Sequence, residues 1–181
     1  MPSETRFAIV VSQFNSEVTH GLLAGAGTYL SDQGIFVAES DIYDAPGAFE
    51  IPLIAQTLAL SGQYDGVICL GCVVKGDTAH FEFISLGATV GLMQASLMTQ
   101  VPITFGIVTA YTDEQALIRS RDDAHNKGRE AAAACWESRL ILRRIHQTEI
   151  LADITEFEKQ TAKPKKAKKK ASKKTKKKAK K

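Results

Sequence analysis

Hydrophobic and polar positions along this chain follow two different periods that replace each other at regular intervals. Four short apolar runs have the length and composition of buried strands: residues 6–12, 35–43, 65–74 and 103–110. Elsewhere, apolar positions recur at helical spacing over residues 16–32, 48–60, 78–98 and 113–119, and in a final segment that begins at 126–128. Strands that alternate with helices in this way predict an α/β fold with a parallel sheet.

The expected architecture is a three-layer αβα sandwich with a four-stranded parallel sheet, of the flavodoxin-like kind. The third run is apolar almost throughout, which is typical of a parallel strand covered by helices on both faces. Polar residues mark the starts of three helices: Asn15 or Ser16 for the first, Asp77 and Thr78 for the third, and Asp113 for the short fourth helix.

In such a sheet, ligands bind at the carboxyl ends of the strands. Here Phe14 follows the first strand, residues 46–50 (Pro-Gly-Ala-Phe-Glu) follow the second, and residues 74–80 (Val-Lys-Gly-Asp-Thr-Ala-His) follow the third. These three loops therefore form the predicted binding site. Taken singly, Phe14, Phe49 and Glu50 also fit ordinary loop or helix-start positions.

His80 falls in the first turn of the third predicted helix, directly after the turn at residues 75–78. The free N–H groups and partial positive charge of a helix N-terminus attract a phosphate. The same field disfavours an imidazolium ion, so a histidine there stays neutral and can accept a proton. An anion site and a proton acceptor within one turn predict an active site. The alternative is a histidine that only packs or caps at the helix start.

The distribution of charge changes this picture at one end of the chain. Of 181 residues, 44% are hydrophobic and 24% charged, which fits one globular domain with a sizeable core. However, 14 of the 23 basic residues are lysines within residues 159–181, which contain no acidic residue. Nine basic and 20 acidic residues remain, so residues 1–158 carry a formal charge of −11. We therefore expect a domain over residues 1–158 and a lysine-rich tail over residues 159–181.

From residue 163 onward the tail has no apolar side chain larger than alanine, so we expect it to be disordered. Its 14 lysines would displace counterions from a polyanion, which indicates non-specific binding to nucleic acid or other polyanions. Because no aromatic residues are interleaved with the lysines, recognition of a particular base sequence is not expected. The alternative is a solvated appendage without a partner.

Cysteine usage and absent motifs narrow the class of protein further. Cys69, Cys72 and Cys135 are few and odd in number, which is typical of a reduced cytoplasmic protein. Cys69 and Cys72 lie in an apolar run, where i and i+3 point to opposite faces of a strand, so we expect buried core cysteines. The first residues lack the regions of a signal peptide, no apolar run approaches the length that spans a bilayer, and metal and nucleotide motifs are absent. We expect neither a membrane partner nor a metal.

Six segments occur in an order that resembles one enzyme family. They are residues 12–15, 46–52 (Pro-Gly-Ala-Phe-Glu-Ile-Pro), 70–82 (Leu-Gly-Cys-Val-Val-Lys-Gly-Asp-Thr-Ala-His-Phe-Glu), 105–109, 114–116 and 126–128. Together they resemble the 6,7-dimethyl-8-ribityllumazine synthases of riboflavin biosynthesis, over roughly residues 6–145. The segments at 46–52 and 70–82 are the most specific.

The resemblance implies an activity. Members of this family are transferases that condense 5-amino-6-(D-ribitylamino)uracil with 3,4-dihydroxy-2-butanone 4-phosphate to 6,7-dimethyl-8-ribityllumazine, and they release phosphate and water without a metal or cofactor. The family is built from rings of five subunits, so a homo-oligomer of pentamers that binds small-molecule substrates is implied here.

The resemblance also implies roles for individual residues. Phe14 would stack on the pyrimidine, and His80 would transfer protons. The backbone of Cys72, Val73 and Val74 would bind the pyrimidine edge, and Ala48, Phe49 and Glu50 would bind the ribityl chain. The backbone of Asp77 and Thr78, together with Arg119, would bind the phosphate. Phe105, Arg119 and Lys127 would come from a neighbouring subunit. Arg119 and Lys127 also fit ordinary cations on a helix surface.

Departures from the family pattern leave the assembly open. Lys75 stands where the family often has arginine, Asp77 places a carboxylate beside the expected phosphate, and residues 120–125 replace a glycine-containing stretch of members that form sixty-subunit shells. Pentamer, decamer and shell all stay open. Two other functions also stay open: the related archaeal-type riboflavin synthase, which acts on two lumazine molecules, and a flavin- or nucleic-acid-binding protein on an inactive enzyme scaffold.

Overall fold

A computed structural model describes residues 5–161, apart from the side chains of residues 149, 152, 153 and 156–161. Its centre is one parallel sheet of four strands, β1 (Phe7–Ser12), β2 (Ile42–Ala45), β3 (Gly66–Val74) and β4 (Ile103–Ala110). The strands lie in the order β2-β1-β3-β4, which is the order of the first four strands in a flavodoxin-like sheet.

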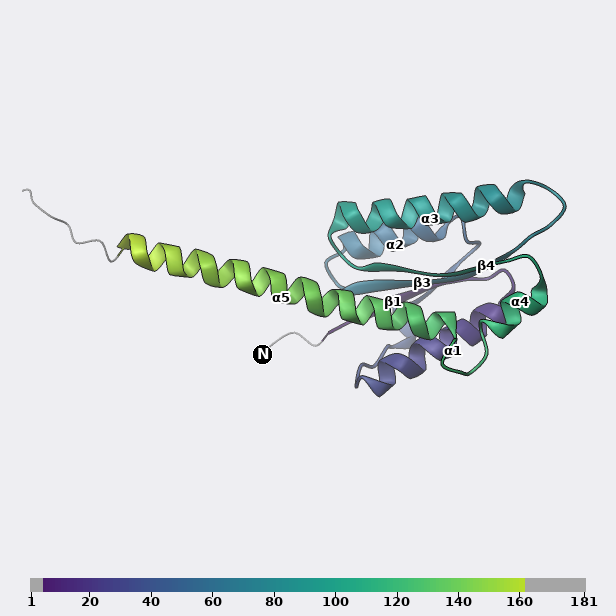
Figure 1. The fold of residues 1–181 in the computed structure, drawn as a ribbon, viewed down its shortest axis with the longest axis horizontal. Helices are drawn as coiled ribbons and strands as arrows, with labels where there is room; N and C mark the ends of the chain where they lie inside the picture. The colour runs from purple at the N-terminus through teal and green to yellow at the C-terminus, as the bar shows by residue number, and fades with distance from the viewer. Residues whose placement is uncertain (1–4, 162–181) are drawn as a thin grey trace, which may run out of the picture. The chain divides into compact units, whose positions relative to one another are not determined.

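Within the described residues, helices cover both faces of this sheet: α1 (Ser16–Asp32), α2 (Ile51–Leu60), α3 (His80–Thr99), α4 (Asp113–Ile118) and α5 (Lys127–Thr161). The helices α2 and α3 pack together on one face, and α1, α4 and the first turns of α5 lie on the other (Figure 1). The predicted three-layer αβα sandwich is confirmed.

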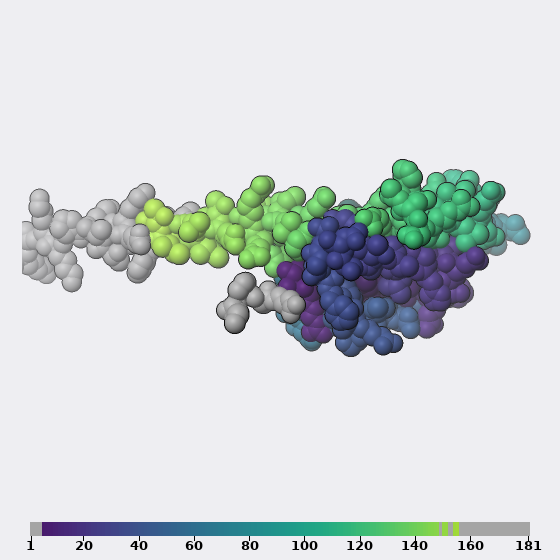
Figure 2. Space-filling model, turned by 90° about the horizontal axis from the view of Figure 1, so that it is seen from below, coloured from purple at the N-terminus to yellow at the C-terminus, as the bar shows by residue number. Residues whose placement is uncertain are grey.

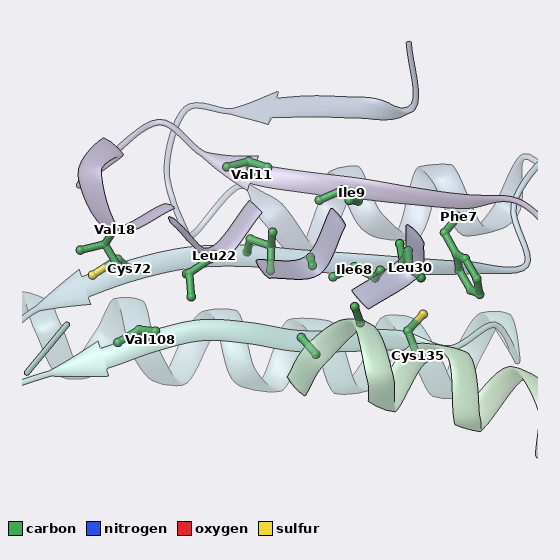
Figure 3. Close-up of a cluster of buried hydrophobic side chains, with 14 of the residues drawn as sticks. Phe7, Ile9, Val11, Val18, Leu22, Leu30, Ile68, Cys72, Val108 and Cys135 are labelled. Carbon is green, nitrogen blue, oxygen red and sulfur yellow. The ribbon is translucent and has the colours of Figure 1, made fainter. Parts of the chain in front are cut away.

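The strands bury side chains on both faces, as their apolar runs predict. Along β1, Phe7, Ile9 and Val11 point toward α1 and α5, while Ala8 and Val10 point toward α2 and α3. Figure 3 shows the first of these two cores, in which β-strand residues meet Leu22 and Leu30 of α1. Each layer of helices is therefore fixed to the sheet by its own apolar cluster.

All three cysteines are free and buried, and this confirms the sequence-based prediction. Cys69 belongs to the cluster beneath α2 and α3, and Cys72 to the cluster beneath α1, so the two thiols lie on opposite faces of β3. Burial raises the pKa of Cys72 to about 11 and that of Cys135 to about 12, and it raises the pKa of Cys69 as well.

Three sequence-based boundaries are wrong. The second strand is predicted at residues 35–43, yet β2 covers only Ile42–Ala45, because residues Glu39–Asp41 form a 3-10 turn that brings Asp41 to Arg6. The second helix begins at Ile51 and not at residue 48. The fourth helix is capped by Thr112, whose hydroxyl accepts from the Gln115 N–H at 3.2 Å, and not by Asp113.

The prediction that no apolar run reaches membrane-spanning length is also wrong. By length and composition alone α3 could cross a bilayer, since it has 20 residues and a mean hydropathy of 1.3 in its most apolar window. Glu82 is the one acidic or basic side chain in this helix if histidine is counted as neutral. In the fold, α3 packs on the sheet through Ala88, Leu92 and Ala95.

The chain divides into two compact units, Met1–Leu142 and Arg143–Lys181, and α5 contributes residues to both. Ala131, Ala132 and Cys135 of α5 belong to the core of the first unit. The predicted boundary between residues 1–158 and 159–181 stays a prediction, since residues 162–181 lie outside the described part of the chain.

A buried carboxylate joins the start of β1 to the turn before β2. Asp41 is 3% exposed and accepts hydrogen bonds from Arg6 Nε at 2.9 Å and from the Tyr64 hydroxyl at 3.0 Å. The bond from Arg6, followed by the bond from Tyr64, lowers the pKa of Asp41. The ionised form of Asp41 therefore stabilises the folded chain.

We expect Asp41→Asn to lower the free energy of unfolding by about 1–3 kcal/mol at neutral pH. Because the pKa of Asp41 is lower in the folded chain, its contribution is complete above the unfolded carboxyl pKa near ~4 and disappears as the pH falls through the folded pKa. Denaturation of the wild-type protein and of Asp41→Asn between pH 7 and pH 2 measures the difference in their free energies of unfolding. The exposed Glu39→Gln exchange is the control, and a difference that stays constant down to pH 2 contradicts the prediction.

Candidate active site

Phe14 and Glu50 come together where β1 and β2 end. Both side chains are exposed, and Phe14 retains 68% of its accessible surface. They meet over Gly47, where a Cβ atom would lie 2.9 Å from Glu50 Oε2 and 3.5 Å from Phe14 Cδ2. The aromatic ring and the carboxylate therefore lie against the same backbone position, where a Cβ atom would displace only the end of the Glu50 side chain. An aromatic face beside an acceptor suits a planar heterocycle that carries hydroxyl groups.

Asn15 connects this pair to the end of β3. Its backbone is left-handed, with φ of 56°, and its Nδ2 donates to the Cys72 carbonyl at 3.0 Å. The sequence predicts Asn15 or Ser16 as the cap of α1, and Asn15 does precede the helix, but its side chain makes no cap hydrogen bond. Asparagine tolerates the left-handed backbone region better than most residues. The prediction of a helix cap did not include this conformation.

The last residues of β3 extend beyond the strand beside them. The pairing of β1 with β3 ends at Val11 and Leu70, whereas β3 continues to Val74 and stays paired with β4. On the β1 side, the backbone of residues 72–74 therefore has no strand partner within the described residues. The Cys72 carbonyl accepts from Asn15, and the other peptide groups at this strand end can bind the edge of a ligand. The resemblance implies this contact for Cys72, Val73 and Val74.

His80 lies in the first turn of α3, as predicted, but the helix begins at His80 and not at residue 78, and the side chain of His80 is exposed. The backbone N–H of His80 lies 3.4 Å from the Thr78 hydroxyl, and Ala79 is the residue that precedes the helix. Asp77 and Thr78 are exposed, and Ala79 at the helix start offers no side-chain cap, so the predicted capping position of Asp77 and Thr78 is wrong, although the Thr78 hydroxyl accepts from the His80 N–H. Apart from the His80 N–H, the first-turn N–H groups of α3 thus have no side-chain cap and can face an anion.

Lys75 and Glu82 close the turn that carries Asp77, Thr78 and His80. The Lys75 ammonium lies 2.5 Å from Glu82 Oε1, and their hydrogen bond raises the pKa of Lys75 and lowers that of Glu82. Lys75 Nζ also lies 5.8 Å from the centre of the Tyr111 ring. Sequence reasoning missed Tyr111, although an aromatic residue directly after β4 stands at the edge where ligands bind.

Phe49 reaches from the loop after β2 to α3. Its ring is 57% exposed, and its Cε2 lies 2.8 Å from the position of a Cβ atom on Gly87. Ala48, in contrast, is 6% exposed and belongs to the core. The side chain of Ala48 is therefore not available to a ligand, and a contact from this residue would have to come from its backbone.

Phe105, Arg119 and Lys127 do not join this group. Phe105 lies in the middle of β4 opposite Cys69 and is 43% exposed. Arg119 donates to the Gln115 carbonyl at 2.7 Å, and Lys127 pairs with Glu130 at 2.6 Å, on the α4 and α5 side of the sheet. Across residues 5–161, no hydrogen bond or ion pair connects these three residues to Phe14, Glu50 or His80.

The described residues offer no cluster of three or more histidine, cysteine, aspartate or glutamate side chains that could hold a metal ion. The groups at the strand ends are instead an aromatic ring, a carboxylate, an imidazole, unpaired peptide groups and a helix N-terminus. Such a set can bind a hydroxylated heterocycle and an anion, and it can transfer protons between them.

Residues 4–143 match the family model described as 6,7-dimethyl-8-ribityllumazine synthase. The chain belongs to this family. A protein called 6,7-dimethyl-8-ribityllumazine synthase 1 from Caulobacter vibrioides is 65% identical over 146 residues, which are 81% of this chain and 95% of that protein. The 6,7-dimethyl-8-ribityllumazine synthase of Salinibacter ruber is 48% identical over 140 residues, 77% of this chain and 90% of its own length.

A third relative, the 6,7-dimethyl-8-ribityllumazine synthase of Deinococcus deserti, is 43% identical over 148 residues, 82% of this chain and 95% of that protein. The resemblance found in the sequence is thus confirmed, as are the enzyme class and its place in riboflavin biosynthesis. The family model ends at residue 143, so the rest of α5 and the lysine-rich tail lie beyond it.

Proposed function

We propose that this protein condenses 5-amino-6-(D-ribitylamino)uracil with 3,4-dihydroxy-2-butanone 4-phosphate, and that it releases 6,7-dimethyl-8-ribityllumazine, phosphate and water. The single observation that carries the proposal is the convergence of Phe14 and Glu50 over Gly47, beside the unpaired end of β3. A ring, a carboxylate and free peptide groups match the base, the polyol and the amide edge of the uracil substrate.

In this proposal Phe14 stacks on the pyrimidine, and the backbone of residues 72–74 binds its edge. Glu50 accepts hydrogen bonds from the ribityl hydroxyls, and Ala48 and Phe49 line the same chain. Support comes from the exposure of the Phe14, Phe49 and Glu50 side chains, together with the position of Asn15 between Phe14 and β3. Ala48 contributes only through its backbone, because its side chain is buried.

The phosphorylated substrate would bind at the start of α3. There the backbone of Asp77 and Thr78, with Arg119, holds the phosphate while it leaves, and His80 transfers protons during Schiff-base formation and phosphate elimination. The uncapped N-terminus of α3 and the exposed imidazole support these roles. Holding two substrates side by side supplies much of the acceleration without a metal or cofactor.

We further propose that the active enzyme is a homo-oligomer built from pentamers, in which Phe105, Arg119 and Lys127 of one subunit complete the site of the next. In one chain, Arg119 bonds Gln115 and Lys127 pairs with Glu130. None of the three residues has a described bond to Phe14, Glu50 or His80. Large apolar side chains on α2 and α3 are 57–74% exposed: Leu53, Leu60, Phe83, Leu86, Met93, Leu97 and Met98. A patch of this kind is characteristic of a subunit interface.

Incubation of the purified protein with both substrates tests the proposed reaction, with lumazine fluorescence and phosphate release as readouts. Both signals should rise together. An archaeal-type riboflavin synthase would instead consume 6,7-dimethyl-8-ribityllumazine and form riboflavin, so product analysis with that compound as the only substrate separates the two enzymes. A protein that turns over neither substrate set is a binding protein, and the proposal fails.

The proposal for the lysine-rich tail is non-specific binding of nucleic acid or other polyanions by an enzyme of the cytoplasm. The charge split supports it, because 14 lysines follow a domain with a formal charge of −11. The cytoplasmic location is supported by three free, buried cysteines, as expected in a reducing compartment.

Deletion of residues 163–181 should leave catalysis intact and abolish retention on DNA or RNA. The full chain should bind with a steep dependence on salt, because lysines release condensed counterions from the phosphate backbone. Electrophoretic mobility shifts at two salt concentrations measure both properties. A variant in which the tail lysines are replaced by glutamine, at unchanged length, is the matched control. If the truncated protein binds nucleic acid as well as the full chain does, the tail is not the contact.

A further inference from the structure

Asn126 is a buried polar residue between the two cations that the proposed reaction uses. It is 1% exposed and lies directly before α5, and its side chain makes five hydrogen bonds. Buried amides with complete hydrogen bonding fix the local backbone firmly. The segment that Asn126 could fix is the one that runs from Arg119 to Lys127.

The amide nitrogen of Asn126 faces three carbonyl groups. Its Nδ2 donates to Gly21 of α1 at 3.0 Å, to Ser120 at 2.9 Å and to Arg121 at 2.8 Å. The first of these bonds spans 105 residues of sequence, and the other two close the loop onto itself. Asn126 thus attaches the loop after α4 to the middle of α1.

The amide oxygen of Asn126 faces the start of α5. Its Oδ1 accepts from the N–H groups of Gly128 at 2.9 Å and Arg129 at 3.1 Å, which caps the helix. Because one end of the amide meets only acceptors and the other only donors, its orientation is fixed. An aspartate could keep the cap, but it would place an oxygen against three carbonyls.

Close packing leaves this amide no room to move. A Cβ atom on Gly25 would overlap with the Asn126 side chain, so α1 must pass Asn126 with a glycine. In Figure 2 the dark-blue and purple surface of α1 adjoins the green surface that includes α4, the loop and the start of α5. The loop is therefore locked between two helices of the same layer.

The loop positions both cations at once. The N–H of Lys127, directly after Asn126, donates to the Arg119 carbonyl at 2.9 Å, so the backbones of the two cations are in contact. We propose that Asn126 is the positioning residue that sets Arg119 and Lys127 for the phosphate of the substrate in a neighbouring subunit. This inference rests on the proposed function and adds to it a residue that touches no substrate.

Asn126→Asp tests the proposal, because it preserves side-chain size and the cap of α5 but removes the bonds to the three carbonyls. The KM for 3,4-dihydroxy-2-butanone 4-phosphate and the Kd for inorganic phosphate should rise about tenfold to a hundredfold, as a displaced binding group implies. The Kd for the ribityl-pyrimidine should stay within about twofold, since Phe14 and Glu50 lie on other loops. Gly25→Ala, which presses on the amide from α1, should give the same pattern and serves where Asn126→Asp fails to assemble.

Two controls separate positioning from general destabilisation. Leu30→Ala removes a buried side chain from the same layer, and it should lower Tm without changing the ratio of the two Kd values. In an Arg119→Ala background, Asn126→Asp should cost little further phosphate affinity, because the two changes remove one function. Equal losses for both substrates, or full additivity with Arg119→Ala, overturn the role of Asn126. Absence of lumazine from the wild-type protein instead overturns the proposed function.

Discussion

His80→Ala should slow turnover by about 10² to 10⁴, the usual effect of removing an acid–base group. The imidazole stands at the exposed start of α3, next to the turn of Asp77 and Thr78, where it can transfer protons to and from the reacting substrates. Binding of the ribityl-pyrimidine should change little, because Phe14 and Glu50 lie at the ends of other strands. Single-turnover rates and the Kd for the pyrimidine measure the two effects separately.

The two substrates also condense without enzyme, which gives a background rate of lumazine formation. Rates are therefore compared at several enzyme concentrations. His20→Ala is the matched control, since His20 is an exposed histidine in the second turn of α1 and lies outside the three loops of the proposed site. Its turnover should equal that of the wild-type protein. Wild-type turnover in His80→Ala would remove His80 from the mechanism.

Mixing two inactive variants should restore activity if each site is shared between subunits. Phe14→Ala and Arg119→Ala proteins, unfolded together and reassembled in equal amounts, should regain about a quarter of the wild-type activity. In a ring each interface joins the Phe14 half of one subunit to the Arg119 half of the next, and a random quarter of interfaces contains two intact halves. This expectation rests on the contacts of Arg119 in one chain, where it donates to Gln115 and makes no described hydrogen bond with Phe14 or His80.

A second mixture supplies the control. Phe14 and His80 belong to the same half, so no arrangement of Phe14→Ala with His80→Ala subunits rebuilds an intact half. That mixture should stay inactive while its assemblies contain both variants, as mass spectrometry can establish. The shared site is excluded if the first mixture also forms mixed assemblies and recovers nothing.

The parts of the fold that rest on apolar periodicity could be predicted from the sequence. β3 and β4 coincide with their apolar runs within one residue, because both are covered by helices. The second strand could not be placed in this way. Residues 35–38 are apolar as in a strand, but residues 39–41 form a 3-10 turn in which Asp41 bonds Arg6. That bond joins residues 35 positions apart, which no local pattern reveals.

The residues of the candidate site also fall into two groups, those that the sequence predicts and those that depend on contacts between distant segments. The loops with Phe14, Glu50 and His80 could be predicted, because the carboxyl ends of parallel strands converge wherever the strands are correct. Asn15 and Asn126 could not, because asparagine before a helix is read as a cap. Asn15 instead bonds Cys72, and Asn126 combines a cap with an attachment to Gly21. Both depend on contacts between distant segments.

Because every cysteine is buried, the surface of this chain presents no reactive thiol. Each thiol lies in the core with a pKa well above neutrality, so none offers an accessible thiolate to an alkylating reagent. A single cysteine introduced on an exposed helix position outside the proposed site and interface, such as Ser31→Cys on α1, becomes the one reactive site of the subunit. Fluorophores or cargo can then be attached in a fixed ratio of one per chain, without first removing the natural cysteines.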